Sequence, residues 1–460
     1  MAISEVRRTS IFYSKTDPPH IANLFSVHLA ILKAIGQVPI NLKLPPPLNA
    51  LNHFLSYIYM IFTFGQIFCV GIVLLVTLCG LSPDATFEEI TDTLTLVIIY
   101  WCAISSSIYW HIKRRRVLKF FQFMNENYWH HSLPGLTFVS WHRSYAYGKR
   151  FLIVWTAAAF FGVTAYGATP LVMGERVLPL KAWYPLDPLQ PYVYEVLYVH
   201  QMLAQMIISA IFASASGIFA SIIIIMCGQF DILYCSLKNL SYYGYLCVGS
   251  DVKRLRAEQA KLLKPTEDEV NQYMYSEEEL TDLSRLQDYS KALQPTLSLT
   301  KVLHSGVVQC IQLHIFIMGA CKEFEQIYNY YCLLKSLQVI SQTCLIAFGG
   351  AVNDLTLALA FNTVQYLFLT ISDMFMYTYF AEILGRHSVR CGEAYWRSQW
   401  INHDMLIRQD ILIFLENSKR AIKFTAGNFY EMDIKSLQRI IAQAFSFFTL
   451  LQKLAAKNKN

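Results

Sequence analysis

Two charged residues, Lys335 and Asp373, stand alone in long apolar stretches of the chain. Ionisable side chains in such stretches are costly, and they normally pair with each other, face water or relay protons. No His-Glu-x-x-His, Gly-x-Ser-x-Gly or phosphate-cradling glycine motif accompanies them. The adjacent His130 and His131 do not share a helix face, so we expect neither a metal site nor a cofactor. The residue types therefore disfavour an enzyme.

The apolar stretches predict an all-α integral membrane protein. Hydrophobic residues make up 54% of the 460 residues and charged residues only 15%. Six apolar blocks are each long enough to cross about 30 Å of hydrocarbon: 54–80, 93–112, 151–174, 196–230, 326–353 and 355–381. Lys335 and Asp373 interrupt the last two blocks. A seventh uncharged run, 440–452, is shorter, and it fits either a seventh transmembrane helix or a buried soluble helix.

The distribution of basic residues predicts which loops face the cytoplasm. Lys and Arg number eight in 113–150, ten in 228–325 and seven in 384–430, whereas 81–92 has none and 175–195 has two. Because cytoplasmic loops carry the excess of Lys and Arg, we expect seven transmembrane helices with the N-terminus cytoplasmic and the C-terminus extracellular. G-protein-coupled receptors have the opposite orientation, and their Asp-Arg-Tyr and Asn-Pro-x-x-Tyr motifs are absent here.

A cytoplasmic helical platform is expected beside the membrane helices. Residues 21–35 have an amphipathic pattern that fits either a helix at the inner interface or a buried helix. Residues 251–283 are polar and mixed in charge, which favours partial disorder. Helical periodicity returns in 284–325 and in 405–424. The expected division is a cytoplasmic N-terminal segment (1–53), helices one to four (54–230), a cytoplasmic loop and helix (231–325), helices five and six (326–384), cytoplasmic helices (385–430) and a seventh helix with a short tail (431–460).

The positions of Lys335 and Asp373 predict an ion pair between neighbouring helices. A short loop around Asn353 joins their two helices into an antiparallel hairpin. Lys335 lies 18 residues before Asn353 and Asp373 lies 20 after it. At about 1.5 Å per residue, both charges are therefore roughly 27–30 Å from the turn. An equal depth in the membrane does not show whether the two side chains face each other around their helix axes. The alternatives are therefore a Lys335 that extends to the inner interface and an Asp373 that faces a water-filled vestibule.

The last helix has a stripe that is polar toward its start and carries leucine toward its end. Five residues fall within about 60° of Gln443 on a helical wheel: Ser436, Arg439, Ser446, Leu450 and Leu454. Such a stripe suits a wet conduit closed by a hydrophobic constriction. Packing against neighbouring helices is the alternative.

Several motifs resemble those of insect odorant receptors. Three segments are similar to the C-terminal signature of that family: Lys423-Phe-Thr-Ala-Gly-Asn-Phe429, Ser436-Leu-Gln-Arg-Ile-Ile441 and Phe445-Ser-Phe-Phe-Thr-Leu-Leu451. Three others are similar to motifs elsewhere in the family: Ala182-Trp-Tyr-Pro-Leu-Asp187, Ala381-Glu-Ile-Leu384 and Ala394-Tyr-Trp-Arg-Ser-Gln-Trp400. The resemblance covers the whole chain. Gustatory receptors usually end in a Thr-Tyr…Gln-Phe pattern, which is missing.

The resemblance implies a tetrameric, non-selective cation channel in the plasma membrane of a sensory-neuron dendrite, opened directly by a small volatile. Its partners would be the lipid bilayer, the odorant and the permeating cations, and no nucleic acid. The chain resembles the odour-tuned subunits, which form a heterotetramer with the co-receptor Orco, because Orco has a longer insertion between helices four and five. A receptor acting through a G protein, a gustatory-type channel and a transporter are the alternatives.

The resemblance also implies where ions and odorant would meet the chain. The seventh helix would line the pore, with Gln443 and Ser446 along the conduit and a gate at Leu450 and Leu454. The odorant would bind in the outer half of the bundle, among helices two, three, four and six. The residues expected there are Ile99, Tyr100, Ala103, Ile104, Phe160, Phe161, Thr164, Tyr198, Met202, Gln205, Met206, Ser209, Asn362, Gln365 and Tyr366.

Overall fold

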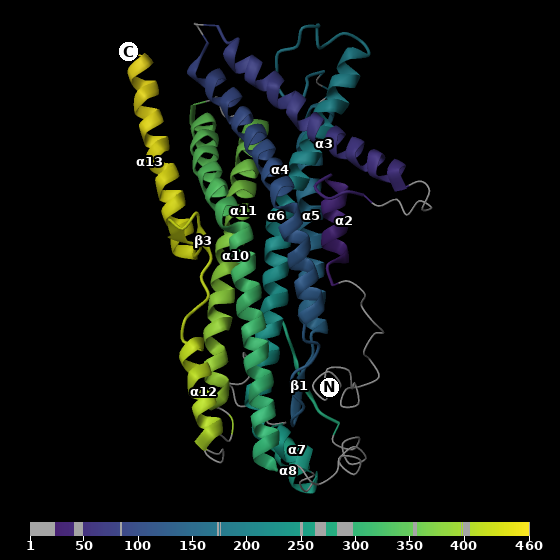
Figure 1. Cartoon of the computed structure of the whole chain (residues 1–460). Coiled ribbons are helices and arrows are strands. Elements are labelled where there is room, and N and C mark those ends of the chain that lie inside the picture. The colour runs from purple at the N-terminus through teal and green to yellow at the C-terminus, as the bar shows by residue number, and fades with distance from the viewer. Residues whose placement is uncertain are drawn as a thin grey trace.

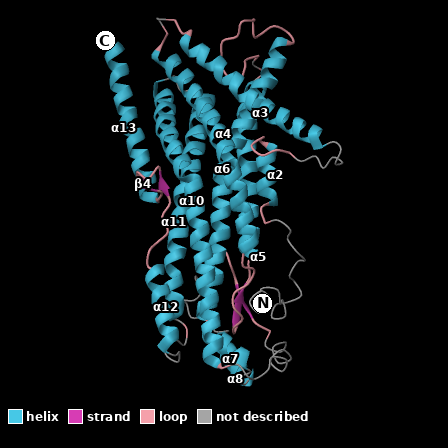
Figure 2. Ribbon diagram, in the orientation of Figure 1, coloured by secondary structure: helices cyan, strands magenta, loops and turns pink. Residues whose placement is uncertain are grey.

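The chain folds into a bundle of long helices with two small two-stranded sheets (Figure 1 and Figure 2). The computed structural model describes residues 24–40, 49–82, 85–172, 174, 176–248, 252–262, 273–282, 298–352, 357–396, 398 and 405–459. Ile21 and the prolines at 45–47 lie outside the described residues.

Six of the described helices are long and apolar enough to cross a membrane. They are α3 (Asn49–Cys79), α4 (Phe87–Asn127), α5 (His142–Val172), α6 (Val193–Lys238), α10 (Leu299–Val352) and α11 (Leu357–Trp396). They coincide with the six apolar blocks of the sequence. They are longer than those blocks because polar turns extend several of them beyond the apolar part, as in the 54-residue α10. Within the described residues, α13 (Ile434–Lys459) does not reach the same apolarity.

α6 is the central helix, and it packs against α3, α4, α5, α10 and α11. In its most apolar stretch 94% of the residues are buried, whereas in the corresponding stretch of α5 only 11% are. Small residues let α5 approach it closely, because a Cβ on Gly148 would lie 2.9 Å from the backbone oxygen of Ser221. The runs of Ala, Ser and Ile in α6 thus form the common wall against which the other helices pack.

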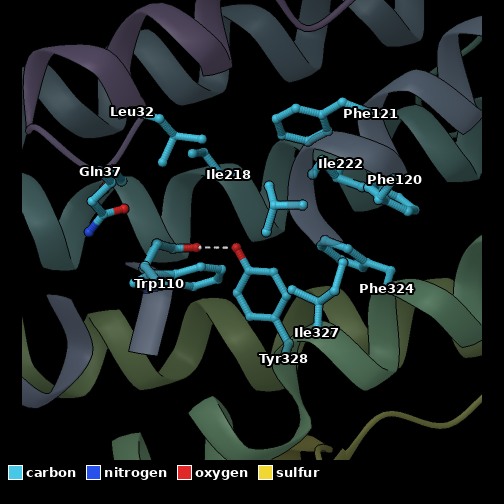
Figure 3. A pocket seen from close by; sticks show the side chains of 13 residues that line it. Leu32, Gln37, Trp110, Phe120, Phe121, Ile218, Ile222, Phe324, Ile327 and Tyr328 are labelled. Carbon is cyan, nitrogen blue, oxygen red and sulfur yellow. Dashed lines mark hydrogen bonds between the residues drawn. The ribbon is translucent and has the colours of Figure 1, made fainter. Parts of the chain in front are cut away.

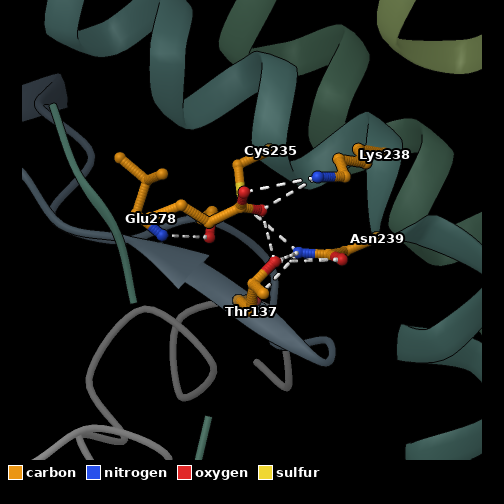
Figure 4. Close-up of polar contacts among 7 residues, drawn as sticks. Thr137, Cys235, Lys238, Asn239 and Glu278 are labelled. Atoms are coloured by element: carbon orange, nitrogen blue, oxygen red, sulfur yellow. Dashed lines mark hydrogen bonds and ion pairs between the residues drawn. The ribbon is translucent and has the colours of Figure 1, made fainter. Parts of the chain in front are cut away.

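Within residues 251–283, the structure describes 252–262 and 273–282, which include a helix and a strand, and the prediction that the segment is partly disordered stays a prediction. Helix α8 (Val252–Leu262) follows α7 (Leu240–Val248), and strand β2 (Glu278–Leu280) pairs antiparallel with β1 (Thr137–Val139). The polar strand β2 is held by partners on α6 and β1 (Figure 4): Lys238 Nζ lies 3.3 Å from Glu278 Oε2, and the Thr137 hydroxyl donates a hydrogen bond to Glu278 Oε1. Sequence composition does not reveal such long-range partners.

α2 (Ser26–Ala34) lies against the bundle. Its residues His28 and Leu32 are buried, and the Phe25 ring stacks on Phe121 of α4 at 4.5 Å. His28 Nε2 shares a 2.9 Å hydrogen bond with Ser221 Oγ of α6. The amphipathic pattern of this segment is therefore used to pack on protein.

A tight hairpin connects α12 (Met405–Ser418) to α13. Strands β3 (Thr425–Ala426) and β4 (Tyr430–Glu431) pair around Gly427 and Asn428, which both have positive φ, 58° and 62°. The loop has three residues, and the 3.0 Å hydrogen bond from the Phe429 amide to the Ala426 carbonyl closes a β-turn whose two central positions suit Gly and Asn. The Asn329 side chain of α10 donates to Thr425 Oγ1 at 2.6 Å, and the Gly427 amide donates to the Asn329 carbonyl at 3.0 Å. The base of α13 is thus fixed to α10, while its C-terminal end stands apart from the bundle (Figure 1).

Candidate functional site

The structure brings Lys335 of α10 and Asp373 of α11 together as an ion pair. Lys335 Nζ lies 2.5 Å from Asp373 Oδ2, and the two side chains are only 4% and 12% exposed. The ammonium also lies 3.3 Å from Gln338 Oε1 and 3.9 Å from the ring centroid of Phe212. In this arrangement Lys335 does not extend to an interface, and Asp373 does not face open water.

The antiparallel register of α10 and α11 positions the pair. Tyr331 lies one helical turn before Lys335, and Tyr377 lies one turn after Asp373. The rings of these two tyrosines are 6.1 Å apart. Aromatic contacts one turn away thus hold the two helices at the spacing that the ion pair needs.

The ion pair lines a cavity of about 160 Å³ between α4, α5, α6, α10 and α11. Most of its wall is apolar or aromatic and includes Leu96, Trp155, Val163, Tyr166 and Phe212. A few polar side chains interrupt the wall, as is usual for sites that bind small molecules. An apolar protein cavity of roughly 150 Å³ can take up benzene, so this one has room for a small organic ligand.

Six of the residues expected to bind odorant line this cavity: Ile99, Tyr100, Gln205, Ser209, Gln365 and Tyr366. They come from α4, α6 and α11. Tyr100 and Gln205 are buried, and Gln365 donates a 3.0 Å hydrogen bond to the Gly162 carbonyl of α5. On these three helices the cavity wall therefore includes part of the predicted set.

On α5, by contrast, the predicted residues face away from the cavity. Phe160 and Phe161 are 37% and 77% exposed on the outside of the bundle, and Thr164 is also exposed. The structure places Trp155, Ala159, Gly162 and Val163 at the cavity instead. α5 is apolar around most of its circumference, so its sequence does not indicate which face turns inward.

The other expected residues on α4 and α6 pack between helices. Ala103 and Ile104 are buried in a cluster with residues of α3. Tyr198 Oη donates a hydrogen bond to the Gly167 carbonyl, and the Met202 sulfur covers Gly167. Met206 is half-buried and lies outside the cavity wall. The side chain of Asn362 lies outside the described residues.

Gln338 and Gln342 belong to the cavity wall although the sequence reasoning did not single them out. They follow Lys335 at spacings of three and seven residues, which places all three on one face of α10. The Gln338 amide donates to Gln342 Oε1 at 3.3 Å. This polar stripe in an otherwise apolar helix is the signal that could have identified them.

A second cavity, of about 20 Å³, lies deeper among α2, α4, α6 and α10 (Figure 3). Gln37, Trp110 and Phe324 are among the residues that line it, and the Tyr328 hydroxyl beside it donates a 3.0 Å hydrogen bond to the Ala215 carbonyl. A space of this size accommodates about one water molecule. It is therefore no candidate for an organic ligand.

The stripe on α13 faces away from the rest of the chain from Gln443 onward, whereas Ser436 at its start is 1% exposed and donates a hydrogen bond to the Glu431 carbonyl. Gln443 and Ser446 are exposed, and Leu450 and Leu454 are 52% and 47% exposed. Leu437, Ile440 and Ala444 are buried on the other side of the helix, which packs on α10 and α11. The four stripe residues therefore do not pack against the described helices of their own chain.

Comparison with known proteins relates the chain to chemosensory receptors of insects. The profile of the family described as 7tm Odorant receptor matches residues 86–445. Putative odorant receptor 85e of Drosophila melanogaster is 40% identical over 445 residues, which cover 96% of this chain and 94% of the relative. Odorant receptor 83a of the same fly is 33% identical over 371 residues, 80% of each chain.

Solved structures share the fold. The insect olfactory receptor OR5 from Machilis hrabei superposes with a TM-score of 0.68 at 12% identity, covering 94% of this chain and 97% of that one. The structure of that receptor in complex with eugenol gives a TM-score of 0.67 at 13% identity, with the same coverage. At this level of identity the likeness establishes the seven-helix membrane fold.

Proposed function

Since the chain belongs to the 7tm odorant receptor family, we propose that it binds a small volatile in the cavity between α4, α5, α6, α10 and α11 and thereby opens a cation channel. Insect odorant receptors are odorant-gated cation channels. The observation that carries the proposal is the cavity of about 160 Å³, whose wall is mainly apolar and aromatic with a few polar groups. Aromatic walls supply dispersion contacts to a ligand without charge.

The path from this cavity to α13 would run through an aromatic cluster. Tyr377, one turn from Asp373, packs on Phe219 at 5.1 Å between ring centroids. Phe219 packs on Phe424 at 5.5 Å, and Phe424 directly precedes the hairpin that fixes the base of α13. A ligand that shifts α11 would thereby move the start of the helix whose exposed stripe, from Gln443 to Leu454, is proposed to line the pore.

The chain would function as the odour-tuned subunit of a heterotetramer with Orco in the plasma membrane of a sensory-neuron dendrite. The excess of Lys and Arg in alternate loops supports a cytoplasmic N-terminus and an extracellular C-terminus. In that orientation the cavity extends from Leu180, in the outer loop between α5 and α6, inward to Lys335 and Asp373, and volatiles would reach it from the outer face.

Current recordings with matched variants test the proposal. Cells that co-express the chain with Orco are exposed to an odorant panel, and Tyr100→Ala is compared with Val154→Ala. Tyr100 is 2% exposed at the cavity, whereas Val154 is 66% exposed on the outside of α5. Tyr100→Ala is expected to shift the half-maximal odorant concentration about tenfold or more, since burying such a ring contributes several kcal/mol. Val154→Ala should leave it unchanged.

An agonist that acts on Orco serves as the folding control, since its response should survive in both variants. Equal loss of the odorant and Orco-agonist responses in Tyr100→Ala would contradict a specific role in binding. Signalling through a G protein is the rival function, and excised patches without nucleotides separate the two. A channel still conducts there on addition of odorant, whereas a G-protein pathway is silent.

A further inference from the structure

The hydrogen-bond donors of the ion pair are already engaged by the protein. The Lys335 ammonium has three N–H donors. It lies within reach of Asp373 Oδ2 at 2.5 Å and of Gln338 Oε1 at 3.3 Å, and the Phe212 ring covers it at 3.9 Å. Lys335 is also only 4% exposed. Two of its three N–H groups therefore have oxygen partners in the protein, and the Phe212 ring limits access to the third.

Other donors of the cavity wall are committed in the same way. The Gln338 amide donates to Gln342, the Gln365 amide donates to the Gly162 carbonyl at 3.0 Å, and the Ser209 hydroxyl donates to the Ala159 carbonyl at 3.2 Å. The bond to Gly162 also fixes which end of the Gln365 amide is its oxygen. Each of these three side chains thus uses at least one N–H or O–H group in a contact within the protein.

Several hydrogen-bond acceptors of the wall, by contrast, have no donor within the described part of the chain. Asp373 Oδ1, Gln365 Oε1 and Gln205 Oε1 are buried and have no hydrogen-bond partner within the described part of the chain. All three belong to residues that line the cavity. The hydroxyl of Tyr100, a fourth lining residue, is buried without a partner in the described residues and can both donate and accept, so acceptors outnumber donors among these four groups. A buried acceptor without a donor is unfavourable, and the last torsion of Asp and Gln side chains is soft, so these oxygens can turn to meet a ligand.

We infer that the cavity selects a small neutral molecule that donates a hydrogen bond, such as an alcohol or a phenol, over an ether or ketone of the same shape. A donor can satisfy any of the three orphaned oxygens, whereas an ether or ketone can accept a bond from the Tyr100 hydroxyl but leaves those three oxygens unpaired. The ligand is neutral because Lys335 cancels the charge of Asp373, and an added ammonium group would stand uncompensated in a medium of low dielectric. This inference rests on the proposed function for the location of the ligand.

Matched ligands test the inference. Wild-type chain co-expressed with Orco is given alcohols and phenols, each beside its methyl ether and the ketone of equal length. Alcohols and phenols are expected to activate at about tenfold lower concentration, the difference that one satisfied buried acceptor makes. The same ligands are added to the purified complex with Orco, where donors should raise Tm more than their ethers. Ethers and ketones that match the alcohols in both measurements would overturn the inference.

Two variants assign the preference to named oxygens. Gln205→Met keeps the side-chain length and removes the amide oxygen, and Lys335→Met with Asp373→Leu removes the charge pair together. Each is expected to reduce the preference for donors while the ether response persists, and Val154→Ala should retain the full preference. A preference unchanged in both variants overturns the assignment.

The experiments distinguish a failure of the proposed channel function from a failure of the inferred ligand preference. Donors that raise Tm in the expected order without evoking current would support the inference and contradict the channel proposal. If no alcohol or phenol binds or activates, whereas ethers or ketones do, the inference is overturned and the channel proposal stands.

Discussion

Lys335 and Asp373 are tolerated inside the bundle because each charge has the other as its partner. The side chains are 4% and 12% exposed, so little water screens their attraction. Gln338 and the Phe212 ring contact the ammonium further. The gain from such a pair relative to two apolar residues is small, since both charges must be desolvated. Removing one partner alone is a different matter, because it leaves a buried charge without compensation.

Charge-swap variants should expose this asymmetry. Lys335→Asp and Asp373→Lys are each expected to lower stability by about 3–5 kcal/mol, the usual cost of breaking a buried pair. The double swap should recover part of that loss, because it restores opposite charges at the same positions. The melting temperature of the purified protein and its amount at the cell surface report the effect. Single swaps that melt like wild type would show that water, rather than the partner, stabilises each charge.

His28 makes the attachment of α2 sensitive to acid. Burial lowers the pKa of His28 to about 3, and the rings of Phe25 and Phe121 lie 5.3 Å and 6.1 Å from it. When α2 detaches, His28 regains a pKa of about 6.5 and takes up a proton below that pH. The stability that neutral His28 contributes is therefore complete above about pH 6.5 and falls as the pH drops toward about 3.

Hydrogen exchange of the α2 amides measures this dependence. Between about pH 7.5 and about pH 5.5, the protection of residues 26–34, corrected for intrinsic exchange, is expected to fall by about tenfold, one pH unit of linkage. His28→Gln can keep a hydrogen bond to Ser221 but does not titrate, so its protection should not change with pH. A pH response of equal size in His28→Gln would assign the effect to another group.

At the scale of elements, the contact of α5 with α6 depends on glycine. A Cβ on Gly148 would lie 2.9 Å from the Ser221 backbone oxygen, and that oxygen cannot move without moving α6. Gly319 of α10 has no atom within 4 Å of the corresponding position. We expect Gly148→Ala to destabilise the protein by about 1–3 kcal/mol through overpacking. Gly319→Ala should be neutral or stabilise it by up to about 1 kcal/mol. The melting temperatures of both variants test this prediction. A Gly148→Ala variant as stable as the wild type would show that α5 and α6 can separate enough to accommodate the added methyl group.

The long helices show how much of the site can be predicted from the sequence. Uncharged length is sufficient to locate the six long helices, because the bilayer demands it. It does not fix helix rotation, so Phe160 and Phe161 were expected at the cavity although they face outward, 37% and 77% exposed. Where polar residues mark a face, as Gln205 and Gln365 do, the expectation agrees with the cavity wall. The rotation of a uniformly apolar helix is set by packing partners that are distant in sequence.

The whole molecule consists of a tightly packed bundle and one helix that stands beside it. The bundle contains the cavity, and the aromatic cluster connects its wall to the segment that starts α13. Phe445, Phe447 and Leu450 are more than half exposed on that helix. Apolar exposure of this extent is typical of a surface that contacts lipid or another subunit. A tetramer in which four such helices surround an axis would cover it and place the stripe from Gln443 to Leu454 along the conduit.

Leu450→Ser tests this arrangement at the proposed gate. A ring of leucines closes a conduit by excluding water, and a hydroxyl at the same height lets water and ions enter. The variant expressed with Orco is expected to raise the resting current several-fold without odorant. Leu412→Ser on α12 is the matched control, because Leu412 is also exposed, at 59%, and belongs to another helix. In the proposed heterotetramer Orco subunits would share the ring, so the measurement also includes ion selectivity and the deactivation rate after odorant is removed. If all three quantities equal those of the wild type and of the control, Leu450 does not lie at the gate, and α13 contacts lipid or a neighbouring subunit through this face instead.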